Sequence, residues 1–258
     1  MTSIVFSKNR AMQLHAFLRS YMAHVTPAKP VHVIYSATTP RHAASYTEVF
    51  AQFPWMSVRC CQDEKGFQST LFNLLPPRGH VIFYVDDQVF IRPWSMVELS
   101  GLSLRLGLHL TRNYASGDTP QPLPSFHQCA YDRVTWRWSE GAIAWGYPLS
   151  VDGHMFDLFE MKPLVEGMVF DSPNTFESAL QQFLPRFLDR HGTCYFQSRA
   201  VNIPWNRVQS DWDNRCGNVP VDDMLEHWEA GKQIDLSGVY GVLNESVHQE
   251  FPLVLEAR

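Results

Sequence analysis

The first third of the chain alternates between short apolar runs and amphipathic segments. Apolar runs cover residues 4–6, 31–36, 56–61 and 81–85, and a continuous run of this kind is typical of a strand buried on both faces. The segments between these runs repeat their apolar residues with helical spacing. The order strand, helix, strand, helix, strand, helix, strand predicts an α/β fold with a mostly parallel, Rossmann-like central sheet flanked by helices.

After Pro93 the alternation becomes irregular. Residues 103–110 predict a further strand and residues 175–190 a helix that a proline kinks or splits. We find no internal repeat. We therefore expect a single domain in which residues 1–93 form a ligand-binding half and residues 94–258 a mixed half.

Two adjacent acids, Asp86 and Asp87, follow the fourth apolar run. Carboxylates at the end of a buried strand are costly unless a positive group meets them. Open α/β sheets bind ligands beyond the carboxyl ends of their strands, so a divalent metal carrying a phosphate group satisfies both conditions. A polar turn rich in Asp explains the same residues, and the residues alone leave both interpretations open.

The first strand runs into the polar turn Ser7-Lys8-Asn9-Arg10, and a helix follows. Backbone N–H groups at the start of a helix favour anions, and an arginine adds positive charge there. We therefore expect an anion to bind at this turn, with Ser7 and Arg10 as candidate contacts.

Composition narrows the class of protein. The chain has 258 residues, of which 45% are hydrophobic and 18% charged, as in a globular protein. A formal charge of -5 argues against nonspecific nucleic-acid binding. Five cysteines without a C-x-x-C pair suggest neither a disulfide framework nor a zinc site. Since no apolar stretch approaches membrane-spanning length and no signal peptide is evident, we expect a cytoplasmic protein.

The order of these elements resembles that of GT-A glycosyltransferases, in particular bacterial family-2-like members. The turn of residues 7–10 with its helix resembles their opening, and Val85-Asp86-Asp87 resembles their DxD-type element, although Gln88 breaks the strict spacing. The resemblance covers essentially the whole chain, and it implies that residues 1–93 are the nucleotide-sugar-binding half and residues 94–258 the acceptor-binding half. It implies transfer of a sugar from a nucleotide diphosphate sugar, a UDP-sugar foremost, to a glycan or lipid-linked acceptor, with inversion at the anomeric carbon.

The resemblance also implies a metal ion, Mn²⁺ or Mg²⁺, that bridges the diphosphate. Asp87 is the expected direct ligand, with Asp86 reaching the ribose or the metal through water and His248 as a third ligand near the C-terminus. Hard cations take oxygen ligands, and such an ion neutralises charge on the leaving diphosphate. A surface histidine in a polar tail explains His248 equally well.

Two further residues are candidate nucleotide contacts, one by resemblance and one by its chemistry. Asp63 resembles the acid that meets the base of the nucleotide, although capping of the next helix also explains it. Arg207, beside Trp205, is a candidate phosphate partner. A buried arginine that supports the fold is the alternative.

Asp152, in Ser150-Val151-Asp152-Gly153-His154, resembles the catalytic base of inverting GT-A enzymes, in which a carboxylate takes the proton of the acceptor hydroxyl. An Asp-Gly turn explains the same residues. Glu177 is the alternative base, but with Asn174 it also reads as a helix capping box.

Two other functions stay open. A sugar nucleotidyltransferase has a similar fold, but residues 7–10 contain none of the glycines of its phosphate loop. A non-catalytic sugar-binding or nucleotide-binding protein of the same fold is compatible with the irregular DxD spacing. Family analogy places the enzyme in polysaccharide or lipopolysaccharide assembly, in the cytoplasm and with peripheral association at the inner membrane.

Overall fold

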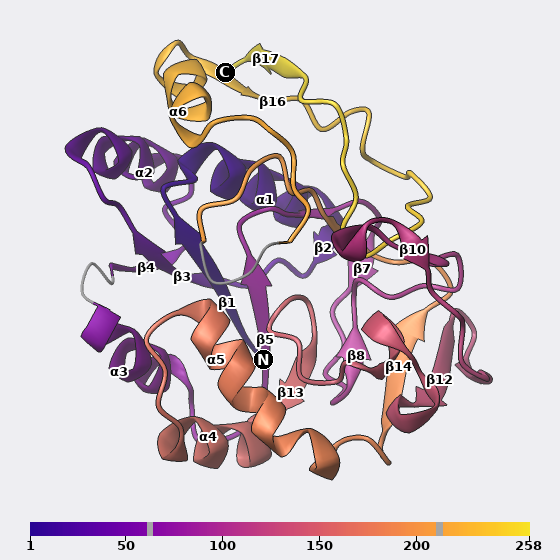
Figure 1. The fold of residues 1–258 in the computed structure, drawn as a ribbon. Coiled ribbons are helices and arrows are strands. Elements are labelled where there is room, and N and C mark those ends of the chain that lie inside the picture. The colour runs from indigo at the N-terminus through magenta and orange to yellow at the C-terminus, as the bar shows by residue number, and fades with distance from the viewer. Residues whose placement is uncertain (61–63, 210–213) are drawn as a thin grey trace.

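The computed structural model describes residues 1–60, 64–209 and 214–258. Its central sheet has five strands in the order β13-β5-β1-β3-β4 (Figure 1). The four strands from the first third of the chain are parallel, whereas β13 pairs with β5 in the antiparallel sense. The predicted α/β class with a mostly parallel sheet is therefore confirmed. The strands are β1 (Thr2–Lys8), β3 (Val31–Ser36), β4 (Ser57–Cys60), β5 (His80–Val85) and β13 (Met155–Asp157).

Helices cover both faces of this sheet. Successive residues of β5 serve different faces, since Ile82 and Tyr84 pack with the residues of α1 and Val81 and Phe83 with those of α3 to α5. This two-sided burial is why the strands read as continuous apolar runs. The helices are α1 (Ala11–His24), α2 (Pro40–Gln52), α3 (Glu64–Leu74), α4 (Leu158–Gly167), α5 (Pro173–Leu180) and α6 (Val221–Glu229).

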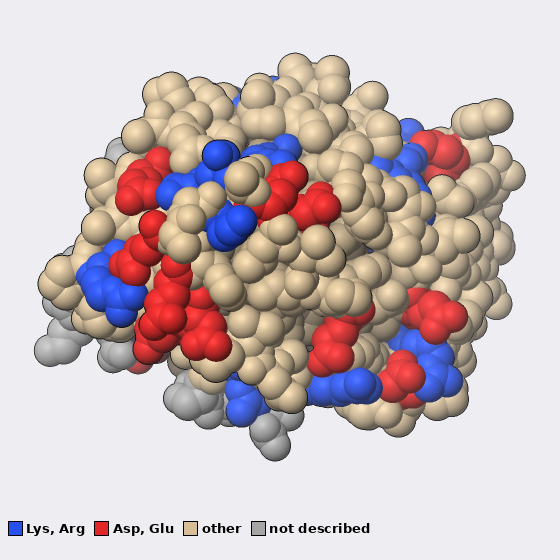
Figure 2. Space-filling view, turned by 90° about the horizontal axis from the view of Figure 1, so that it is seen from above, with Lys and Arg blue, Asp and Glu red and all other residues tan. Residues whose placement is uncertain are grey.

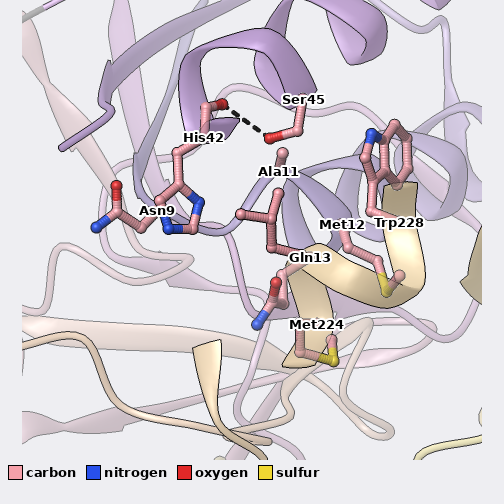
Figure 3. Close-up of a pocket in the computed structure, with 9 residues that line it drawn as sticks. Asn9, Ala11, Met12, Gln13, His42, Ser45, Met224 and Trp228 are labelled. Carbon is pink, nitrogen blue, oxygen red and sulfur yellow. Dashed lines mark hydrogen bonds between the residues drawn. The ribbon is translucent and has the colours of Figure 1, made fainter. Parts of the chain in front are cut away.

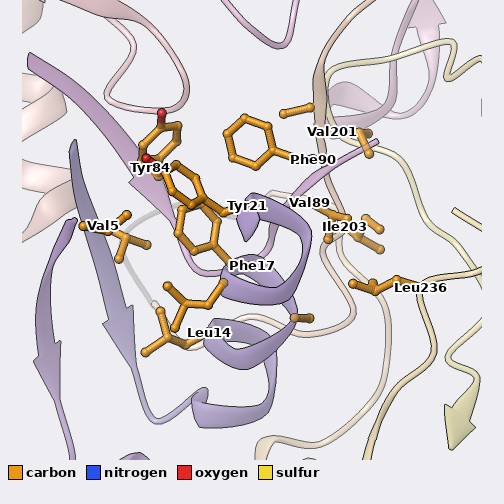
Figure 4. Packing of buried hydrophobic residues seen from close by; sticks show 14 of the residues in the cluster. Val5, Leu14, Phe17, Tyr21, Tyr84, Val89, Phe90, Val201, Ile203 and Leu236 are labelled. Atoms are coloured by element: carbon orange, nitrogen blue, oxygen red, sulfur yellow. The ribbon is translucent and has the colours of Figure 1, made fainter. Parts of the chain in front are cut away.

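The α1 face carries an aromatic core. Phe17 lies with its ring centroid 5.3 Å from that of Tyr84 and 6.1 Å from that of Phe90, and Figure 4 shows these aromatic residues in one cluster. Phe90 belongs to β6 (Gln88–Phe90), which pairs with β15 (Ala200–Asn202) from the second half of the chain. This packing fixes the strand that follows the paired acids.

A second sheet, in the order β11-β12-β14-β8, lies beside the first. Its core contains Trp136, Trp138 and Trp145, and the two rings of Trp136 and Trp138 leave no room for a side chain at Gly192. The strands are β8 (Leu102–Ser103), β11 (His127–Ala130), β12 (Arg133–Arg137) and β14 (His191–Tyr195).

Short elements complete the described part of the chain. Three two-stranded ribbons pair β2 (Val25–Thr26) with β7 (Trp94–Ser95), β9 (Arg112–Asn113) with β10 (Thr119–Pro120), and β16 (Lys232–Ile234) with β17 (Leu255–Ala257). The 3₁₀ turns are η1 (Tyr114–Ser116), η2 (Trp138–Glu140), η3 (Ile143–Gly146) and η4 (Gln181–Arg186).

The helix expected over residues 175–190 is shorter than predicted. α5 ends at Leu180, and the 3₁₀ turn η4 follows with Pro185 inside it, because proline cannot donate the hydrogen bond that a continuing α-helix requires. The capping box is formed by Ser172 and Thr175. The predicted pairing of Asn174 with Glu177 in a capping box is therefore wrong.

Candidate functional site

A buried ion pair around Asp86 joins the turn after β1 to the turn after β5. Ser7 Oγ donates a hydrogen bond to Asp86 Oδ2 at 2.7 Å, and Arg10 Nη1 donates to Asp86 Oδ1 at 2.9 Å. Only 4% of the Asp86 side chain is exposed. Arg10 thus supplies positive charge that a buried acid requires.

Two other segments hold Arg10 in place. The Tyr46 hydroxyl accepts a hydrogen bond from the Arg10 backbone N–H at 3.0 Å, and Arg10 Nη2 donates to the Asn206 carbonyl at 2.5 Å. Burial raises the pKa of Asp86 to about 6, with Arg10 acting in the opposite direction. The predicted anion contacts Ser7 and Arg10 therefore both bind Asp86 in this structure.

Asp87 is the more accessible acid of the pair, with 14% of its side chain exposed. Its Oδ1 accepts a hydrogen bond from Asn202 Nδ2 at 2.9 Å, and its Oδ2 lies 3.3 Å from Arg10 Nη1. Asn202 lies opposite Gln88 in the β6–β15 pair. Asp87 therefore faces the second half of the chain.

Asp152 lies in the loop before β13, and Gly153 N donates to the Phe83 carbonyl of β5 at 2.8 Å. Asp152 Oδ2 forms a buried ion pair with Arg105 Nη1 at 2.7 Å. Burial raises the pKa of Asp152 to about 7, with Arg105 opposing that shift and Asp87 adding to it. A carboxyl group that titrates near neutral pH is suited to act as a general base.

The Asp-Gly turn expected here is also present. Gly153 has φ of +75°, a conformation that glycine adopts without strain. Residues 149–151, which resemble an apolar strand in the sequence, form no strand. The turn places Asp152 beside the carboxyl end of β5.

Glu177 holds the loop that carries Asp152. Its Oε1 accepts a hydrogen bond from the Tyr147 hydroxyl at 2.9 Å, and its Oε2 accepts one from Val151 N at 2.8 Å. Burial raises the pKa of Glu177. Since both oxygens bind the loop, Glu177 fits a positioning role better than that of a base.

Arg105 is the central cation of this part of the site, and it was absent from the predicted residues. Besides Asp152, it donates to Ser150 Oγ at 2.9 Å and to Asn202 Oδ1 at 3.3 Å. The strand expected over residues 103–110 is confined to Leu102–Ser103. A single charge within the apolar run Leu102-Ser103-Leu104-Arg105-Leu106 was the signal for this buried residue.

The C-terminal segment brings His248 to the same place. His248 and Asn202 form a β-bridge, and His248 Nε2 lies 3.8 Å from Asp152 Oδ2. Burial lowers the pKa of His248, Arg105 lowers it further, and Asp87 acts in the opposite direction. The imidazole is therefore neutral at pH 7, which is the form that binds metals.

Within the described residues, no group of three His, Cys, Asp or Glu side chains is close enough to hold a metal ion by itself. A cation that arrives with a diphosphate needs only one or two protein ligands, since phosphate oxygens and water complete its shell. Of the predicted ligands, Asp87 and His248 are therefore the residues that could hold such a cation, since Asp86 is engaged by Arg10 and Ser7.

Asp63 lies outside the described residues. Arg207 is exposed, so the alternative of a buried structural arginine is wrong. Its Nη1 donates to the Asn214 carbonyl at 3.2 Å. It follows Asn206, whose carbonyl binds Arg10, so its backbone is adjacent to the site.

A small pocket between α1, α2 and α6 lies next to Arg10 (Figure 3). Gln13 connects the pocket to the site, because its Nε2 donates to Asn206 Oδ1 at 3.2 Å. The pocket therefore adjoins the expected anion-binding turn. It is lined by Asn9, Ala11, Met12, Gln13, His42, Ser45, Met224, Leu225 and Trp228.

The surface over this end of the molecule is electrostatically mixed. Figure 2 shows Lys and Arg side chains next to Asp and Glu, in a chain of formal charge -5. Among the described helices, none is long and apolar enough to cross a membrane.

No protein-family model matches the chain, and no curated protein matches it. Among solved structures, the chain is similar to the apo form of the WbbM bifunctional glycosyltransferase, with 12% sequence identity and a TM-score of 0.35. The match covers 79% of this chain and 39% of that one, so the chain spans well under half of that protein's length. A likeness this distant carries no functional assignment.

Proposed function

We propose that the protein is a GT-A type glycosyltransferase that moves a sugar from a nucleotide diphosphate sugar to the hydroxyl of a glycan or lipid-linked acceptor, with inversion. The supporting observation is the pairing of Asp152, a buried carboxyl group whose pKa is about 7, with Asp87 at the carboxyl end of β5. Ligands of open α/β sheets bind in this crevice. Asp152 acts on the acceptor hydroxyl, and Asp87 acts on the diphosphate of the donor.

In the proposed reaction, Asp152 takes the proton of the acceptor hydroxyl while that oxygen attacks the anomeric carbon. Arg105 orients Asp152 through their 2.7 Å ion pair. Glu177 fixes the same loop through Val151 N.

On the donor side, Ser7 and Arg10 hold Asp86 and thereby fix the turn that carries Asp87. Asp87 and His248 are the residues that would hold Mn²⁺ or Mg²⁺. The ion, when bound, neutralises negative charge on the leaving diphosphate.

The test begins with thermal shifts in UDP, GDP, CDP and dTDP, each with and without Mn²⁺, followed by nucleotide release from the matching nucleotide sugars. We expect Asp152→Asn to keep the thermal shift and to lower turnover by about 10²- to 10⁴-fold, because only the base is lost. Asp87→Ala should abolish the part of the shift that depends on metal.

Asp223→Asn on the exposed face of α6 is the matched control, and both its shift and its turnover should equal those of the wild type. A protein that none of the four nucleotides stabilises, with or without Mn²⁺, contradicts the proposed function. Full turnover in Asp152→Asn removes that residue from the mechanism.

A further inference from the structure

Gln88, the residue after the paired acids, is fully buried, with 0% of its surface exposed. Neither Oε1 nor Nε2 of its carboxamide has a hydrogen-bond partner among the described residues. A buried amide without a partner destabilises a fold, because it has lost its hydrogen bonds to water. An apolar side chain of similar size avoids that loss, so packing alone does not explain this glutamine.

The carboxamide packs against the loop that carries Asp152. A Cβ atom on Gly153 would lie 2.7 Å from Gln88 Nε2 and 3.2 Å from Arg105 Cγ. The Gln88 carboxamide and the aliphatic part of the Arg105 side chain therefore both lie against the α-carbon of Gly153. This contact also explains why the position after Asp152 has no side chain.

Asp152 precedes Gly153 in the chain and Arg105 lies against Gly153, and each of these two residues also has an unpaired polar atom. Asp152 Oδ1 is an acceptor without a donor, and Arg105 Nε is a donor without an acceptor, within the part of the chain that the structure describes. Gln88 provides a hydrogen-bond donor, Nε2, and a hydrogen-bond acceptor, Oε1. Polar groups that lie beyond hydrogen-bond distance of one another are commonly joined by water, and a buried water makes two to four such bonds.

We propose that Gln88 is a positioning residue for Asp152, joined to Asp152 Oδ1 and Arg105 Nε through one enclosed water. The link fixes the rotation of the carboxylate while Arg105 holds Oδ2. Gln88 thereby couples the turn of the paired acids to the loop of the base. Its effect on sugar transfer rests on the proposed function, but the coupling itself does not.

The coupling is tested by a double-mutant cycle on unfolding in urea. Gln88→Leu is introduced into the wild type and into Asp152→Ala, and the shift of the urea unfolding midpoint is measured in each background. We expect the shift in Asp152→Ala to be less than about half of that in the wild type, because the effects of linked residues are not additive. Equal shifts in the two backgrounds overturn the proposal. If Asp152→Ala does not fold, Asp152→Asn takes its place as the second background. A third background, Arg105→Met, is judged by the same criterion: the midpoint shift caused by Gln88→Leu should be less than about half of its value in the wild type.

Gln121→Leu is the matched control for the cycle. Gln121 is also buried, its Nε2 is also without a partner among the described residues, and its Oε1 accepts from Ala144 N at 3.1 Å. Its midpoint shift should be the same with and without Asp152.

A kinetic measurement separates positioning from packing. We expect Gln88→Leu to lower kcat for nucleotide-sugar turnover by about 10- to 100-fold with the donor KM unchanged, and Gln88→Asn to recover part of the loss because it keeps the carboxamide. An unchanged kcat in Gln88→Leu overturns the proposal. A wild-type protein that turns over no donor contradicts the proposed function, and the urea cycle then still decides the role of Gln88.

Discussion

At the scale of single residues, burial outweighs ion pairing at Asp86 and at Asp152. Arg10 lies 2.9 Å from Asp86, and Arg105 lies 2.7 Å from Asp152. Even so, burial raises the pKa of Asp86 to about 6 and that of Asp152 to about 7. Desolvation of a buried carboxylate thus exceeds the attraction of its partner, and the fold holds Asp152 in a state that takes up a proton near pH 7.

The pH dependence of stability tests this conclusion at Asp152. Its pKa in the folded state is about 7, against ~3.9 in the unfolded chain. Between about pH 5 and 6.5 the folded form retains a proton that the unfolded form has lost, so this group's contribution to stability falls as pH rises. The contribution amounts to about 1.4 kcal/mol per pH unit.

Asp152→Asn lacks the pH-dependent contribution to stability that comes from protonation of Asp152. Its unfolding free energy, measured in urea at intervals across this window, should decline less steeply with pH than that of the wild type. Exposed Asp223→Asn should keep the wild-type slope. Identical slopes for Asp152→Asn and wild type would mean that Asp152 has an ordinary pKa.

At the scale of elements, the periodic segments were predictable and their ends were less so. β1, β3, β4 and β5 lie where the apolar runs placed them, because two-sided burial leaves a continuous apolar signature. The start of α5 was misassigned, since both Asn174 and Ser172 are capping residue types. Which of them caps depends on where the chain turns into the helix, and this is set by packing.

Removal of the Ser172 hydroxyl tests the observed cap. Ser172 Oγ accepts a hydrogen bond from Thr175 N at 3.2 Å, so Ser172→Ala should lower the unfolding free energy by about 1 kcal/mol. Ser178→Ala, at an exposed position inside the same helix, should have an effect near zero or slightly stabilising. Equal losses in the two variants would show that Ser172 is not the cap.

At the scale of the whole molecule, the two halves of the chain complete each other. β13 of the second half pairs with β5, with Met155 opposite Ile82, and β15 pairs with β6. The acids of the candidate site come from both halves, Asp87 from the first and Asp152 from the second. A site divided in this way requires the halves to fold together.

We therefore expect one cooperative unfolding transition for the entire chain. Scanning calorimetry should give a single peak whose calorimetric and van't Hoff enthalpies agree, as for a two-state domain. Two separate transitions would contradict the prediction of a single domain. Nucleotide added at saturating concentration should move the whole peak without splitting it.

The sequence by itself determined the α/β class, the four parallel strands and the paired acids after β5, because burial and turn chemistry leave local patterns. It also singled out Asp152, through its Asp-Gly turn and its family resemblance. Only the tertiary structure decided that Arg10 binds Asp86, that Arg105 binds Asp152 and that His248 lies beside it, since these pairs join residues far apart in the chain. Ion pairs of this kind depend on distance in space, and no local periodicity records it.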